Sequence, residues 1–89
     1  MNISKELEGK AIKLVDIARF EKMANGGESL GDALGMLSEM RVKRVSGAWV
    51  VCLPLSMENK AVYDPVADSW DCEVCLVNTE AELCYEVVV

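Results

Sequence analysis

The side chains best able to do chemistry in this sequence are cysteines and carboxylates, because its 89 residues include no histidine. Histidine is the commonest general base and metal ligand, and every Ser-His or Cys-His nucleophile pair requires it. What remains is four cysteines and fifteen Asp and Glu residues. We therefore expect a protein that is not an enzyme.

Cys72 and Cys75 form a C-x-x-C motif, with Cys52 and Cys84 elsewhere in the chain. A four-cysteine zinc site normally takes two such pairs from tight turns. The alternation along Trp70 to Val77 predicts a strand, in which residues three apart point to opposite faces, so this pair would not converge on one metal. We favour buried thiols acting as small apolar side chains in a reducing compartment, with no metal or cofactor.

A second candidate metal site consists of Asp64, Asp68 and Asp71, whose oxygens could bind Mg²⁺ or Ca²⁺. A calcium loop needs ligands at alternate positions and a glycine for its sharp turn, and this segment has neither. The stretch is better interpreted as a solvated acidic loop.

Charge is distributed unevenly along the chain. Residues 1–45 carry a net charge of +1 and residues 46–89 a net charge of −7, with Lys60 as the one base of the second half. Such a field repels nucleic acid and anionic lipid and attracts basic protein surfaces. The acids of this half are the predicted partner-binding residues: Glu58, Asp64, Asp68, Asp71, Glu73, Glu80, Glu82 and Glu86.

An alternative binding site combines cations with an aromatic ring. Arg41 and Arg44 could hold a phosphate, and Trp49 could stack on a base, which makes these three the alternative ligand-binding residues. The basic stretch that also contains Lys43 is equally well explained as a polar strand face that pairs with the acidic half. Trp49, at an alternating strand position, is more typical of a core residue.

Two N-terminal helices are predicted from apolar residues at helical spacing. The first runs from about Ser4 to Ala24 and ends at Asn25-Gly26-Gly27. The second opens near Ser29, which can cap its first turn. Its glycines, Gly31 and Gly35, would allow close backbone packing. The two expected core stripes are Leu7, Ala11, Leu14, Ile17 and Ala18, and Leu30, Ala33, Leu34, Leu37 and Met40.

From Arg41 the apolar period changes to two, which predicts strands. Short connections favour an antiparallel meander in which the segment Ala48 to Leu53, apolar on both faces, is central. We expect an α+β fold, a single domain over 1–89 with a helical part (1–40) and a part made of a mostly antiparallel sheet of four to five strands (41–89). The expected strands are Arg41 to Val45, Ala48 to Pro54, Lys60 to Tyr63, Trp70 to Val77 and Leu83 to Val89, with a turn or short helix from Asn78 to Glu82.

No apolar run approaches the ~20 residues that cross a bilayer. The N-terminus, Met1 to Glu6, lacks the apolar core of a signal peptide. Both features predict a cytoplasmic protein without a membrane partner.

In size, acidity, lack of catalytic groups and α+β form, the chain resembles the small phage proteins that inhibit bacterial immunity, anti-CRISPR proteins among them. A second resemblance covers residues 29–89. Its pattern is Leu30-x-x-Ala33-Leu34-x-x-Leu37, then Arg44 and Trp49, and a closing Tyr85-Glu86-Val87-Val88. This pattern is similar to the phage Thoeris anti-defence proteins, which sequester cyclic nucleotide signals.

The first resemblance implies an inhibitor of a bacterial immune system, acting in the cytoplasm of the host cell. It would bind stoichiometrically to the basic surface of a defence complex and compete with nucleic acid there. The second implies a sponge for a cyclic nucleotide. A small structural or assembly protein is a third reading, and the C-terminal strand ending in Val87-Val88-Val89 favours homodimer formation.

Overall fold

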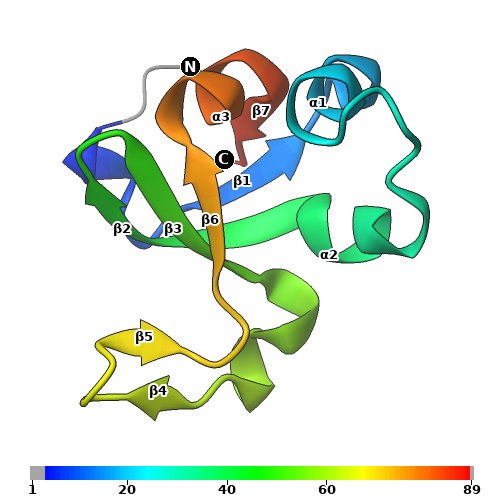
Figure 1. Ribbon diagram of the computed structural model, residues 1–89. Coiled ribbons are helices and arrows are strands. Elements are labelled where there is room, and N and C mark those ends of the chain that lie inside the picture. The colour runs from blue at the N-terminus through cyan, green and yellow to red at the C-terminus, as the bar shows by residue number, and fades with distance from the viewer. Residues whose placement is uncertain (1–3, 89) are drawn as a thin grey trace.

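The computed structural model describes residues 4–88, and its centre is a five-stranded antiparallel sheet in the order β6-β3-β2-β1-β7 (Figure 1). A separate two-stranded hairpin, β4-β5, projects from it. The strands are β1 (Ala11–Leu14), β2 (Glu39–Ser46), β3 (Trp49–Pro54), β4 (Tyr63–Asp64), β5 (Ser69–Trp70), β6 (Val74–Val77) and β7 (Tyr85–Val87). The helices are α1 (Ile17–Ala24), α2 (Leu34–Leu37) and α3 (Asn78–Cys84), with 3₁₀ turns at Lys5–Leu7, Gly31–Ala33 and Leu55–Lys60. The α+β class is confirmed.

The first half of the expected N-terminal helix is a strand. Ile12 of β1 lies opposite Met40 of β2 on one side and Val87 of β7 on the other. Ile12 and Leu14 are buried while Lys13 between them is exposed, which is the alternation of a strand with one wet face. Leu7, Ala11 and Leu14 have helical spacing, but pairing of this segment with β2 and β7 makes it a strand.

The second half of that expected helix is α1. The Asp16 carboxylate caps it by accepting a hydrogen bond of 3.1 Å from the backbone amide of Arg19. The helix ends before Asn25-Gly26-Gly27, as predicted, and both glycines have positive φ.

The second expected helix is much shorter than predicted. It is reduced to the 3₁₀ turn Gly31–Ala33 and the single-turn helix α2, while Met40 is fully buried in β2. A Cβ atom at Gly31 or Gly35 would meet nothing within 4 Å, so neither glycine serves close packing. Gly31 instead adopts a φ of +56°, a left-handed conformation that favours glycine.

The hairpin of β2 and β3 is confirmed, and β3 is an interior strand buried on both faces. The expected strand Trp70 to Val77 is wrong as one unit, because a turn at residues 71–73 divides it into β5 and β6. Lys60 ends a 3₁₀ turn and does not begin a strand.

The meander is also wrong, since β1 lies between β2 and β7. Of the turn or short helix predicted from Asn78 to Glu82, the structure has the helix, α3, which extends through Cys84 and takes Leu83 out of the expected last strand. Val89 lies outside the described residues.

The main core lies between one face of the sheet and the helices. Tyr85 anchors it, because its ring packs edge-on against Phe20 at 5.7 Å and its hydroxyl donates to the Leu37 carbonyl at 2.7 Å. The core residues are Leu7, Ile12, Leu14, Phe20, Leu30, Met40, Val42, Val45, Val50, Cys52, Leu76, Ala81, Cys84 and Tyr85. No described helix is long and apolar enough to cross a membrane.

Candidate functional site

Residues 61–71, which we name the hairpin arm, project on the side of the sheet opposite α1 and α3 (Figure 1). The turn at its tip is shaped by Asp64, whose carboxylate accepts hydrogen bonds from the amides of Val66 (2.9 Å) and Ala67 (3.3 Å). At its base the Asp71 carboxylate accepts from the Val62 amide at 3.0 Å. The arm is therefore held in shape by its own aspartates.

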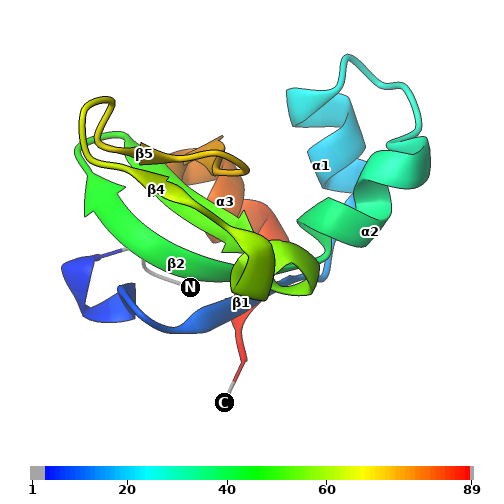
Figure 2. The same ribbon diagram turned by 90° about the horizontal axis from the view of Figure 1, so that it is seen from below.

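Figure 2 shows the hairpin arm lying over β2. A group of side chains holds it there. Arg44 donates to Asp68 at 3.1 Å, and the Tyr63 hydroxyl donates to the same carboxylate. We name Arg44, Tyr63 and Asp68 the arm latch. Beside it, the Lys43 ammonium lies 4.9 Å from the centre of the Trp70 ring, in cation–π range.

A β-bulge makes this convergence possible. The register between β2 and β3 shifts between Val42 and Arg44, so Lys43 is an extra residue in β2. Consecutive residues of a regular strand point to opposite faces. The bulge instead lets Lys43 and Arg44 both reach the arm.

Electrostatics in the latch favour a charged Asp68. The hydrogen bond from Tyr63, and then Arg44, hold the pKa of Asp68 below its ordinary value. The same hydrogen bond raises the pKa of Tyr63, because loss of the phenolic proton would leave two acceptors facing each other.

The arm also exposes apolar side chains next to its acids. Val66 at the tip is 95% exposed, and Val62 and Tyr63 are exposed as well. Apolar and aromatic side chains with a polar rim are the usual composition of a protein-binding surface. Isolated exposed valines are common, but here two of them and a tyrosine gather on one projection.

The predicted acidic residues lie in three parts of the molecule. Asp64, Asp68 and Asp71 lie on the arm and Glu73 follows it. Glu58 lies in the 3₁₀ turn that follows β3 in the chain, where its carboxylate pairs with the Arg41 guanidinium at 3.2 Å. The remaining acids are at the opposite end of the molecule: Glu80 and Glu82 on α3 and Glu86 on β7.

Their charges are not equally available. Asp68 and Glu58 are each neutralised by an arginine of β2. Asp64 and Asp71 are exposed and accept hydrogen bonds from uncharged backbone amides, and within residues 4–88 neither forms an ion pair with a Lys or Arg. The two exposed aspartates are thus the strongest acidic contacts that the arm offers.

The alternative ligand residues come together only in part. Arg44 and Trp49 line a groove of about 370 Å³ with Ser46, Val51, Glu73 and Cys75. Arg41 is elsewhere, held by Glu58 and the Gly9 carbonyl. The core assignment of Trp49 is wrong, because this residue, the first of β3, is 51% exposed.

The four cysteines are free in the structure and differ in burial. Cys52 and Cys84 are buried as predicted, whereas Cys72 is half-buried and Cys75 is exposed. Desolvation raises the pKa of Cys52 to about 12. Partial desolvation, followed by the charge of Glu73, raises the pKa of the exposed Cys75, so neither thiol favours a thiolate. Within residues 4–88 no three metal-ligating side chains form a cluster.

Two features of the site were not predicted from sequence. One is the apolar surface of the arm, although the run Val62 to Val66 inside an acidic stretch was a usable signal. The other is the bulge at Lys43, which leaves no local signature. In comparisons with known proteins, no family model, curated protein or solved structure matches this chain.

Proposed function

We propose that this chain is a stoichiometric binding protein whose hairpin arm docks on a basic, nucleic-acid-binding surface of another protein. The observation that carries the proposal is the arm itself, on which exposed apolar residues lie beside the charged carboxylates of Asp64 and Asp71. Carboxylates fixed on a hairpin can occupy the Lys/Arg contacts that normally hold phosphates.

The arm suits this role because its shape exists before binding. Hydrogen bonds that the Asp64 and Asp71 carboxylates accept from backbone amides, together with the latch, fix its conformation, so little ordering entropy would be lost on docking. Four carboxylates and no Lys or Arg occur within residues 61–73. The field of this segment would also speed encounter with a basic partner.

Following the resemblance to anti-CRISPR proteins, we propose a bacterial defence complex as the partner and an inhibitory role in the host cytoplasm. Inhibition would be competitive with nucleic acid and would require no catalysis. The acids on α3 and β7 would contribute long-range attraction only.

The test neutralises the arm without changing its fold. Asp64→Asn with Asp71→Asn removes two charges and keeps the oxygen that accepts each backbone amide. Glu82→Gln with Glu86→Gln is the matched control, with the same charge change at the other end of the molecule. Binding to a panel of purified CRISPR surveillance complexes is measured by biolayer interferometry, with and without target DNA.

We expect the arm variant to bind at least roughly tenfold more weakly than the unmodified protein. The control should lose much less affinity, because charges in direct contact with the partner contribute most to binding. DNA should displace the unmodified protein. Equal losses in both variants, or binding unaffected by the arm variant, would contradict the proposal, as would failure of the unmodified protein to bind any complex of the panel.

A second candidate function, a cyclic nucleotide sponge, is favoured by one observation. Arg44 and Trp49 line the same groove, where a phosphate and a base could be held together. Calorimetry with a panel of cyclic nucleotides tests it, with Trp49→Ala as the variant that should lose binding. An absence of heat with every nucleotide would remove this candidate.

A further inference from the structure

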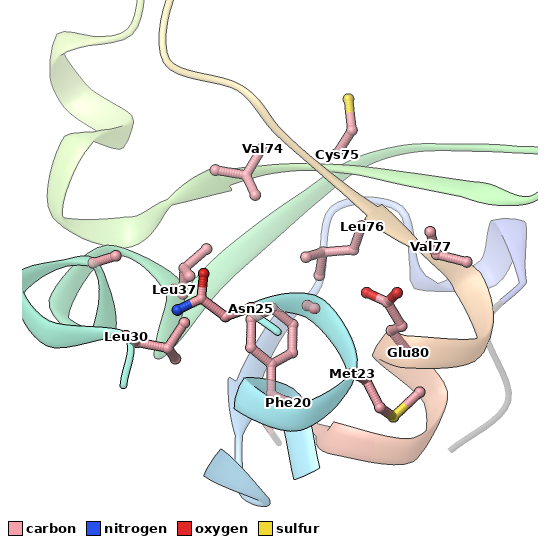
Figure 3. Close-up of a pocket in the computed structure, with 12 residues that line it drawn as sticks. Phe20, Met23, Asn25, Leu30, Leu37, Val74, Cys75, Leu76, Val77 and Glu80 are labelled. Carbon is pink, nitrogen blue, oxygen red and sulfur yellow. The ribbon is translucent and has the colours of Figure 1, made fainter. Parts of the chain in front are cut away.

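A second surface of the molecule, which meets the groove of Arg44 and Trp49 only at Cys75, combines an apolar hollow with an open sheet edge. The hollow measures about 380 Å³ and lies between α1, α2 and β6. Figure 3 shows Phe20, Leu37 and Leu76 around it, while the thiol of Cys75 points away. The lining is apolar apart from Asn25 and Glu80.

The strand that borders the hollow is the last of the sheet on that side. Within the described residues β6 pairs with β3 alone. The edge is short, but its four residues, Val74, Cys75, Leu76 and Val77, include no charge, proline or bulge that would block a partner strand.

Its free hydrogen-bonding groups can be assigned from the register. The Asn78 amide donates to the Ala48 carbonyl at 2.7 Å, and the pairing continues with Leu76 opposite Val50. Antiparallel pairs alternate between bonded and non-bonded, so Leu76 bonds to β3 while both backbone groups of Cys75 and the amide of Val77 are directed outward. Cys75 offers a partner strand a donor and an acceptor. Val77 offers a donor alone, because it is the N-cap of α3 and its carbonyl accepts the first hydrogen bond of that helix.

From this geometry we propose that β6 binds an extended, basic peptide segment of a partner protein, which adds a strand to the sheet. Alternate side chains of that segment would enter the hollow, as in other cases of β-augmentation. A Lys or Arg of the segment would pair with Glu80, whose carboxylate is directed toward β6 (Figure 3).

The charges around the hollow favour a basic peptide segment over a second copy of the chain. Glu80 is the single charged side chain that lines the hollow, and it has no basic neighbour in the lining. Pairing two β6 edges would bring two acidic halves together, each with an excess of seven negative charges. A basic segment gains from the same field.

The experiment titrates the ¹⁵N-labelled protein with a defined probe, an end-capped octapeptide of alternating valine and threonine that ends in two lysines. We expect the amide resonances of Cys75 and Val77 to shift and their hydrogen exchange to slow. A peptide with glutamates in place of the lysines should bind at least roughly fivefold more weakly. A peptide N-methylated on alternate residues should not bind, because it cannot form the ladder.

Two pairs of variants make the test specific. Cys75→Pro removes an outward amide and spares the bonds to β3, whereas Cys75→Ser keeps the amide; the first should abolish binding and the second retain it. If the proline variant does not fold, a comparison of Glu80→Lys with Glu82→Lys tests the proposal instead. Only Glu80→Lys should reverse the preference between the lysine and glutamate peptides.

Several outcomes would overturn the inference: unshifted Cys75 and Val77 amides, equal binding by Cys75→Pro, or no change of preference with Glu80→Lys. Concentration-dependent shifts of the same amides without peptide would identify the occupant as a second copy, which also overturns it. None of these results bears on the arm, whose test uses other residues.

Discussion

Asp68 is the residue on which the position of the arm depends most directly. Its carboxylate binds two side chains from different elements, Arg44 of β2 and Tyr63 of β4. It also has a φ of +52°, a conformation that aspartate and asparagine tolerate better than most residues. Sequence alone marked Asp68 as one acid among eight, because the partners that distinguish it are 24 and 5 residues away.

We predict that acid releases the arm. The pKa of Asp68 is depressed below 3.8, so the latch is complete above that pH and is lost as the pH falls through the folded-state value. Asp68→Asn should release the arm at neutral pH and remove the acid dependence while tolerating the positive φ. The measurement is Trp70 fluorescence against pH in a Trp49→Phe background.

The control for this prediction is Asp32→Asn, which removes an exposed carboxylate away from the arm. Its fluorescence should follow the parent protein at every pH. If Asp68→Asn also behaved like the parent, the latch would not hold the arm.

At the scale of elements, the strand β1 separates the observed fold from the expected one. Its four residues lie in the interior of the sheet, between β2 and β7, and Ile12 is fully buried. The helix that was expected to contain it would instead have buried Ile17, which is 41% exposed in α1. The two isoleucines therefore distinguish the two arrangements.

We predict that Ile12→Ala lowers the free energy of unfolding by about 2–5 kcal/mol, through lost burial and the cavity left behind. Ile17→Ala, the same truncation on an exposed site, should cost no more than about 0.5 kcal/mol. Urea denaturation of both variants measures the difference. Equal losses, or a larger loss for Ile17→Ala, would contradict the placement of β1.

At the scale of the whole molecule, net charge acts on every element at once. The chain carries a charge of −6, and its radius of gyration is 12.4 Å. The Debye length is about 30 Å at 0.01 M salt and about 3 Å at 1 M, so repulsion spans the molecule only at low salt. Salt also weakens exposed ion pairs, but such pairs contribute little to the free energy of unfolding.

We predict that added NaCl raises the Tm between 0.01 and about 0.3 M, because screening relieves this repulsion. Glu82→Lys with Glu86→Lys changes the net charge from −6 to −2, and its Tm should depend less on salt. Differential scanning calorimetry of both proteins provides the comparison. A Tm that fell with salt would mean that ion pairs outweigh the net repulsion.

Features that depend on local chemistry were predictable from the sequence. The hairpin of β2 and β3, the end of α1 at Asn25-Gly26-Gly27 and the helix after Asn78 were all predictable, because turn residues and apolar periodicity act within a few residues. The lack of histidine and the acidity of the second half can likewise be counted directly from the sequence.

Tertiary structure decided the features that depend on contacts between distant residues. Strand β1 forms because β2 and β7 supply its hydrogen-bonding partners. A short apolar segment can form a helix or a strand, and its tertiary contacts decide which. The arm lies over β2 because Arg44, next to a bulge, reaches Asp68. The open edge of β6 follows from strand order, since a strand is an edge only when the rest of the sheet has formed elsewhere.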